Sequence, residues 1–173
     1  FIKLLVIMMI KKIYILLLLI GSVYSESKIF ASDAESGDSF GRAVSNYNEW
    51  FVVGANRDDD NGQNSGSVYA YKDNGYGELN EFKITPNDGD YNEYFGKSLA
   101  ISDDWLAVSA IYDDENGDKS GSVYIYYYNG LDWIEFTKIN PEDGAAYDRF
   151  GYSVDLFENR MIVGSVYDDD YGE

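Results

Sequence analysis

Short apolar runs rich in Val, Ile, Phe, Trp and Tyr recur along this chain, separated by segments of Asn, Asp, Gly and Ser. Runs of this length and composition predict β-strands joined by turns. The predicted strands are residues 41–46, 50–55, 67–71 and 79–85 in one stretch, and 96–102, 105–110, 122–128 and 133–139 in the next. Only a few polar residues separate the first two strands of each stretch, which predicts an antiparallel hairpin.

The two stretches are copies of one repeat. Phe-Gly pairs begin at residues 40, 95 and 150, at intervals of 55 residues. Residues 40–71 and 95–126 match each other closely, and a third copy begins at Phe150. A fixed period of this length predicts an architecture in which each unit packs on the next.

The second strand of each copy is continuously apolar at residues 50–53 and 105–108. Such a run is typical of a strand that is covered on both faces. Stacked sheets provide that cover, as the blades of a β-propeller do. We therefore predict an all-β fold of four-stranded antiparallel blades, with about two and a half blades in this chain.

Residues 1–25 resemble a secretory signal peptide. Lys11 and Lys12 precede the apolar run 13–20, and small residues follow it up to Ser25. The alternative is a membrane anchor, for which this run is too short. The sequence thus predicts secretion or exposure on the extracellular face of the cell surface, with no membrane insertion by the mature chain.

The chain contains no Cys and no His, which excludes disulfides, Cys/His zinc sites, thiol nucleophiles and a His general base. Its formal net charge is −18. Without residues 1–25 it has 10 basic and 31 acidic residues, a formal charge of −21. This charge argues against nucleic-acid binding and favours cations or basic partners.

One more segment is in phase with the repeat. Lys28 and Ile29 lie 55 residues before Lys83 and Ile84. We interpret them as a fourth strand that completes the last blade of a closed ring, because a free strand edge is unfavourable. A chance resemblance of a short segment is the alternative.

Three features together suggest a family. They are the Phe-Gly pairs, the Gly-Ser-Val-Tyr segments at residues 66–69 and 121–124, and the ends of the second strands at residues 53–55, 108–110 and 163–165. The last read Val-Gly-Ala, Val-Ser-Ala and Val-Gly-Ser. This pattern resembles the FG-GAP repeat, the blade of integrin alpha-type β-propellers. The resemblance implies a ring of about seven blades, of which this chain is a fragment with blades at roughly residues 33–87, 88–142 and 143–173, all within residues 26–173.

Acidic loops follow the second strand of each copy, at residues 58–62, 113–117 and 168–172. Calcium binds six to eight hard oxygen ligands, so these loops predict Ca²⁺ as the candidate cofactor. The candidate ligands are Asp58, Asp60, Asn61, Asp113, Glu115 and Asn116. The alternative is a set of solvated turns.

The position of these loops departs from the family pattern. The calcium loop of integrin-type repeats lies immediately before the second strand. Here that position holds residues 45–49, 102–104 and 157–160, which are too short and too poor in acidic residues. The family's calcium ligands are therefore not transferred to this chain. In an up-and-down blade, the acidic loops and the loops between blades should share one rim.

We interpret the chain as a non-catalytic module for extracellular binding or adhesion, with a protein or glycan ligand. The alternative is part of a secreted hydrolase, carbohydrate-active or other, that uses two carboxylates. A structural surface-coat protein is a third possibility. The paired tyrosines could stack on sugars, although packing between blades is favoured; these are Tyr69 with Tyr71 and Tyr124 with Tyr126.

Overall fold

The computed structural model describes residues 28–158 and 160–169. The chain divides into two units, residues 1–30 and residues 31–173. In the first unit only residues 28–30 are described, and they have no regular secondary structure. The predicted signal peptide lies outside the described residues.

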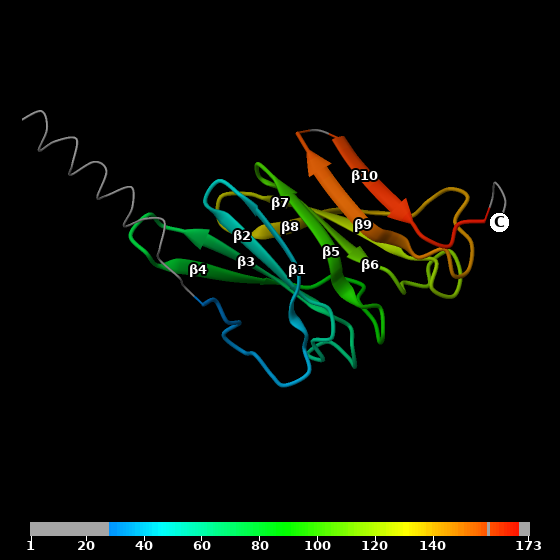
Figure 1. The fold of residues 1–173 in the computed structure, drawn as a ribbon, viewed down its shortest axis with the longest axis horizontal. Helices are drawn as coiled ribbons and strands as arrows, with labels where there is room; N and C mark the ends of the chain where they lie inside the picture. Colours follow the sequence, from blue (N-terminus) through cyan, green and yellow to red (C-terminus); the bar gives the residue numbers. More distant parts are fainter. Residues whose placement is uncertain (1–27, 159, 170–173) are drawn as a thin grey trace, which may run out of the picture. The chain divides into compact units, whose positions relative to one another are not determined.

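The second unit contains ten described strands (Figure 1). They are β1 (Phe40–Tyr47), β2 (Trp50–Ala55), β3 (Ser67–Asp73), β4 (Leu79–Ile84), β5 (Phe95–Ser102), β6 (Trp105–Ala110), β7 (Ser122–Tyr128), β8 (Trp133–Ile139), β9 (Phe150–Phe157) and β10 (Arg160–Ser165). Among the described residues there is no helix, and hence none that could span a membrane.

The strands form three sheets of the predicted kind. Their orders are β1-β2-β3-β4, β5-β6-β7-β8 and β9-β10, and every pairing is antiparallel. The eight predicted strands agree with the observed ones to within two residues at each end. The all-β prediction, with four-stranded antiparallel blades, is confirmed, and the sheets do not close into a ring.

The Phe-Gly pairs mark a β-bulge at the start of each inner strand. The register between β5 and β6 shifts between Phe95 and Leu99, and Gly96 has a φ of +83°. A residue with a Cβ is strained in this left-handed region, which favours glycine. The bulge lets Phe95 turn inward, where it is fully buried and lies edge-on to Tyr124 at 5.5 Å between ring centroids.

The main core lies between the first two sheets. Trp50 of β2 is only 2% exposed. Its ring lies 4.7 Å from that of Tyr128, 5.0 Å from that of Trp133 and 5.6 Å from that of Phe82. The strand β5 contacts both β1 and β9, and most of it is buried. Stacking of the sheets therefore covers the apolar second strands, as the sequence predicted.

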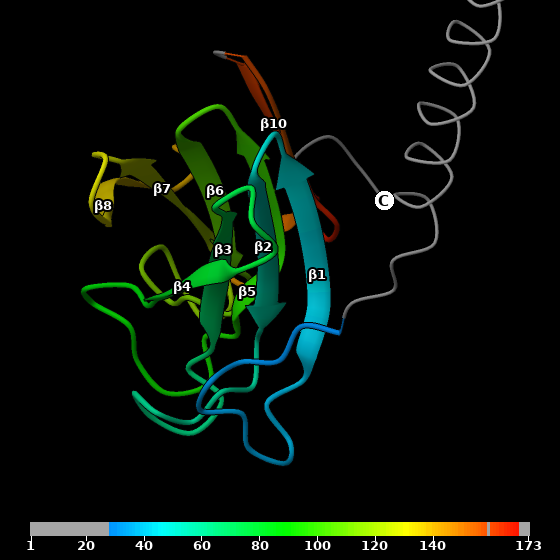
Figure 2. The same cartoon turned by 90° about the vertical axis from the view of Figure 1, so that its left-hand side faces the viewer.

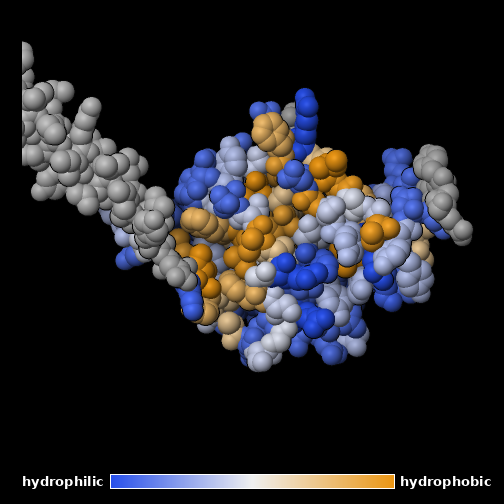
Figure 3. All heavy atoms as spheres, in the orientation of Figure 1, coloured by the Kyte–Doolittle hydropathy of each residue, from blue (hydrophilic) through white to orange (hydrophobic). Residues whose placement is uncertain are grey.

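Equivalent positions differ in burial according to whether a described sheet packs against them. Val44 in β1 is 70% exposed, whereas Leu99, one repeat later, is 6% exposed. Trp105 is 39% exposed, whereas its counterpart Trp50 is 2% exposed. Hydrophobic residues accordingly gather in the middle of the face that presents β1 and β5 (Figure 3). The repeat places an apolar side chain at each of these positions, and packing of the neighbouring sheet completes the burial of that side chain.

The bulge glycines offer a test of sheet packing. Gly41 and Gly96 are equivalent, with φ values of +89° and +83°. A Cβ on Gly41 meets nothing within 4 Å, whereas one on Gly96 would lie 2.7 Å from the carbonyl oxygen of Ser67 in the neighbouring sheet. We expect Gly41→Ala to cost about 1–2 kcal/mol, the cost of the left-handed backbone. Gly96→Ala should cost at least about 1 kcal/mol more, because the sheets must separate.

Urea unfolding of both variants measures this difference. Equal losses of stability in the two variants would contradict the close approach of the first two sheets.

Candidate functional site

The acidic loops begin with a buried aspartate. Asp58 follows β2 and is 3% exposed, and Asp113 follows β6 and is 1% exposed. Each Oδ1 accepts a hydrogen bond from the backbone N–H two residues later, at 3.1 Å from Asp60 and 3.0 Å from Glu115. This turn directs the carboxylate inward. A buried carboxylate requires a partner of opposite charge.

That partner is a lysine in the outer strand of the same sheet. The Lys138 ammonium of β8 lies 2.7 Å from Asp113 Oδ2, 2.9 Å from Asp88 Oδ2 and 3.0 Å from Glu115 Oε2. The Tyr124 hydroxyl donates to Asp88 at 2.9 Å and to Asp113 at 3.1 Å. We call these five residues the second lysine cluster.

The preceding repeat contains the same arrangement, the first lysine cluster. Lys83 of β4 lies 2.7 Å from Asp33 Oδ2 and 3.1 Å from Asp58 Oδ2, and it also contacts Asp60. The Tyr69 hydroxyl donates to Asp58 at 2.7 Å and to Asp33 at 2.8 Å. Two copies of one arrangement indicate a structural element of the repeat.

The pKa shifts in the second lysine cluster follow from these contacts. Burial opposes the charged form of Lys138, but its hydrogen bonds to the three carboxylates outweigh burial and raise its pKa. Burial would raise the pKa of Asp88, yet the hydrogen bonds from Lys138 and Tyr124 lower it. Burial, followed by the charge of Asp113, raises the pKa of Tyr124. The lysine is therefore charged and the tyrosine neutral near neutral pH.

The structure brings four of the six predicted calcium ligands together in two separate pairs. Asp58 and Asp60 meet at Lys83, and Asp113 and Glu115 meet at Lys138. The two asparagines lie apart: the Asn116 amide donates to the carbonyl of Pro141 at 2.8 Å, and Asn61 is exposed to solvent.

The positive charge at these carboxylates comes from the chain itself. Within residues 28–158 and 160–169, no three Asp or Glu side chains are arranged as a metal-binding group. Calcium binding by these loops stays a prediction. Sequence reasoning did not include Lys83 and Lys138 in the site, although they recur with the 55-residue period.

The paired tyrosines belong to the interior. Tyr69, Tyr71, Tyr124 and Tyr126 are all 3% exposed or less. Tyr126 donates to Glu135 Oε2 at 3.3 Å. These side chains are therefore packed within the fold, as the favoured interpretation predicted, and cannot stack on a sugar.

The acidic loops and the loops between sheets share one rim, as predicted. The backbone N–H groups of Tyr94 and Phe95 donate to the carbonyls of Asn64 at 3.1 Å and Ser65 at 2.9 Å. The next junction repeats this pairing between residues 147–150 and 118–120. Both kinds of loop lie at the lower end of the first sheet in Figure 2. Backbone hydrogen bonds thus fix the loops of the rim to one another.

Comparison of sequences agrees with this repeated geometry. The sequence model of the FG-GAP repeat matches residues 23–71, 79–126 and 133–173. The chain belongs to the FG-GAP repeat family. No curated protein matches it. FG-GAP repeats form β-propeller modules, and domains built from them are typically non-catalytic.

The FG-GAP match is offset from the sheets. Residues 79–126 include the outer strand β4 of the first sheet and then β5, β6 and most of β7. One FG-GAP unit in the sequence therefore spans two sheets. The second lysine cluster accordingly joins two FG-GAP units, because Asp88 lies in the match at residues 79–126 and Lys138 in the match at residues 133–173.

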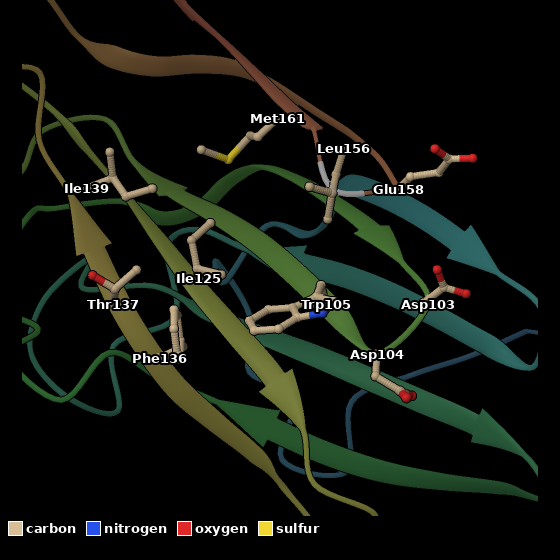
Figure 4. A pocket seen from close by; sticks show the side chains of 10 residues that line it. All are labelled: Asp103, Asp104, Trp105, Ile125, Phe136, Thr137, Ile139, Leu156, Glu158 and Met161. Carbon is tan, nitrogen blue, oxygen red and sulfur yellow. The ribbon is translucent and has the colours of Figure 1, made fainter.

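An apolar cleft of about 770 Å³ lies between the second and third sheets. In Figure 4, Trp105 lies between apolar side chains, including Ile125 and Met161, and a group of carboxylates at one end. At the preceding junction, Tyr128 and Trp133 cover the equivalent Trp50. The cleft therefore lies beside the third sheet, which has two described strands instead of four and does not cover Trp105 fully.

One carboxyl group on the rim that carries the acidic loops has a strongly raised pKa. Burial, followed by the charge of Asp113, raises the pKa of Glu93 to about 7. Glu93 accepts a hydrogen bond from the backbone N–H of Asp90 at 3.0 Å. Asp38 and Asp148 occupy the same position in the other repeats and make the same bond. This recurrence assigns Glu93 a structural role in the turn.

The raised pKa of Glu93 predicts a pH dependence of stability. The folded pKa lies above the unfolded value, so the favourable contribution is complete at low pH and is lost as the pH rises to about 7. Glu93→Gln retains the acceptor and does not titrate. Between acidic and mildly alkaline pH, its stability relative to wild type should therefore rise by about 1 kcal/mol, after allowance for solvent screening.

Urea unfolding of Glu93→Gln across this pH range checks the prediction, with the exposed Glu142→Gln as control. The prediction is wrong if the stability difference is independent of pH.

The second lysine cluster predicts a large loss on removal of its cation. Lys138→Met leaves Asp113 buried beside two other carboxylates, and we expect a loss of about 3–5 kcal/mol. Lys119→Met is the control, because its ion pair with Asp118 is exposed and long at 3.7 Å; it should cost less than about 1 kcal/mol.

Thermal unfolding of both variants measures these losses. Added calcium should restore stability to Lys138→Met more than to Lys119→Met, because the freed carboxylates can accept a divalent cation. Similar losses in the two variants would show that the cluster contributes little to stability.

Proposed function

We propose that this FG-GAP chain is a non-catalytic extracellular binding module whose loop-bearing rim contacts a protein or glycan ligand. The observation that supports it is the rigid rim itself, in which both repeats hold the acidic loops by a lysine cluster and by backbone hydrogen bonds. Loops that are already ordered lose little conformational entropy on binding. Loops on a rigid scaffold are where recognition usually occurs.

The charge of the rim favours a partner with a basic surface. Asp59 and Asp114 are exposed on adjacent loops, and neither belongs to a lysine cluster. A chain with a net charge of −18 attracts basic proteins through long-range electrostatics. The leader-like residues 1–25 support an extracellular location.

A panel of extracellular proteins and glycans, probed with the whole chain, tests this proposal. The matched variant is Asp59→Asn with Asp114→Asn. It keeps the oxygens that accept backbone hydrogen bonds from Asn64 and Lys119 at 2.6 and 2.7 Å, and removes two charges. We expect affinity for the partner to fall by about tenfold, which corresponds to about 1.4 kcal/mol, and its salt dependence to decrease.

Asp132→Asn is the control, since Asp132 lies between β7 and β8, at the opposite rim. The absence of any partner in the panel, or equal binding by all three proteins, would overturn the proposal.

A further inference from the structure

A polar cavity of about 390 Å³ lies where the first two sheets meet, at the starts of β1 and β5. Its volume is within the range of small-molecule sites. The cavity is lined by Ser39, Arg42, Asn56, Arg57, Tyr94, Lys97, Ile111 and Tyr112.

The lining consists of the same four repeat positions taken from two consecutive repeats. Residues 39, 42, 56 and 57 correspond to residues 94, 97, 111 and 112, at the 55-residue period. The side chain differs at every one of these positions, whereas the adjoining Ser-Gly-Ser-Val-Tyr segments are identical. Because the fold accepts different residues at these positions, the fold alone does not require the residues of the first repeat.

The cavity is basic in a strongly acidic protein. Arg42, Arg57 and Lys97 line it, and no Asp or Glu does. Within the described residues, none of these three forms an ion pair. Burial, followed by the positive charges of Arg42, Arg57 and Arg149, lowers the pKa of Lys97. An anion in the cavity would relieve this repulsion.

Asn56 adds a requirement for a hydrogen-bond donor. It lines the cavity, is 4% exposed, and its Oδ1 has no hydrogen-bond partner among the described residues. A buried amide oxygen without a donor is unfavourable. A ligand that carries hydroxyl groups as well as a negative charge would satisfy both Asn56 and the arginines.

At the next junction, the equivalent positions form a cation–π stack. Arg149, which corresponds to Tyr94, lies over the rings of Tyr112 at 5.1 Å and Tyr167 at 4.5 Å. At the first junction, Arg57 takes the place of Tyr112, and the ring of Tyr94 lies 5.0 Å from that of Tyr112. The cation–π stack is absent from the first junction in the described structure, and a cavity lies there instead.

We propose that this cavity binds a single carboxylated sugar, such as a uronic acid residue of an extracellular glycan. The arginines and lysine would hold the carboxylate, Asn56 would accept from a ring hydroxyl, and the ring of Tyr94 would contact the apolar face of the sugar. The acidic loops nearby disfavour a polyanion and permit a small ligand with one charge. This inference goes beyond the proposed function, which concerns a partner with a basic surface at the acidic loops.

Calorimetric titration of the whole chain with glucuronic acid, at about 150 mM salt, tests the inference. We expect binding in the millimolar range and none for glucose, which lacks the charge. Glucose 6-sulfate serves as a third probe, to separate a requirement for carboxylate from one for any anion; equal or tighter binding of the sulfate would overturn the carboxylate assignment.

Two variants test the site itself. Arg57→Gln should weaken binding of glucuronic acid by about tenfold or more, because a charge-assisted hydrogen bond is lost. Asn56→Ile with Arg57→Tyr installs the residues of the second repeat, which the same backbone already accepts, and should abolish binding. Arg160→Gln, an exposed arginine outside the cavity, is the control and should bind as wild type does.

The outcomes separate this inference from the proposed function. If the chain binds a partner in the panel but not glucuronic acid, or if Arg57→Gln binds glucuronic acid normally, the cavity assignment fails alone. If the chain binds glucuronic acid through Arg57 but has no partner that depends on Asp59 and Asp114, the rim proposal fails and the cavity assignment stands.

Discussion

The rim of this protein depends on a buried ion cluster. Asp113 is almost completely removed from solvent, and its charge is tolerable only because Lys138 reaches it from the outer strand. The same ammonium binds Asp88, which precedes the inner strand, and Glu115 in the acidic loop. One lysine therefore ties together the inter-sheet loop, the acidic loop and the outer strand of a sheet, and the preceding repeat does this again.

The sheets in turn depend on one another. A single sheet of this repeat has an apolar second strand that needs cover on both faces, and the adjacent sheet supplies it. The contrast between Trp50 and Trp105 shows this dependence, because identical residues in equivalent strands are 2% and 39% exposed. The apolar cleft around Trp105 has the same cause, because the equivalent surface around Trp50 is covered by the neighbouring sheet.

Opposite charges are separated on the rim. The acidic loops carry the negative charge outward, while Arg42, Arg57 and Lys97 gather near the inner strands. The acidic residues that form the lysine clusters recur with the repeat and are explained by its stability. Arg42 and Lys97 are equivalent positions that are basic in both repeats, whereas Arg57 departs from the repeat, because Tyr112 takes its place in the second copy. Positions that vary within an otherwise constant scaffold are where a repeat protein can acquire a specific ligand.

The sequence by itself determined the strands, their antiparallel hairpins and the stacked repeats, because short apolar runs, turn residues and a fixed period can all be recognised along the chain without its tertiary contacts. It also located the acidic loops and four carboxylates, two of which gather around each of two lysines. It did not determine that Lys83 and Lys138 provide these two positive charges, nor that Arg57 lines a cavity with Lys97. Lys83 and Asp33 are 50 residues apart. Only the tertiary structure decided these contacts, because they form between strands and loops that meet when the sheets fold and stack.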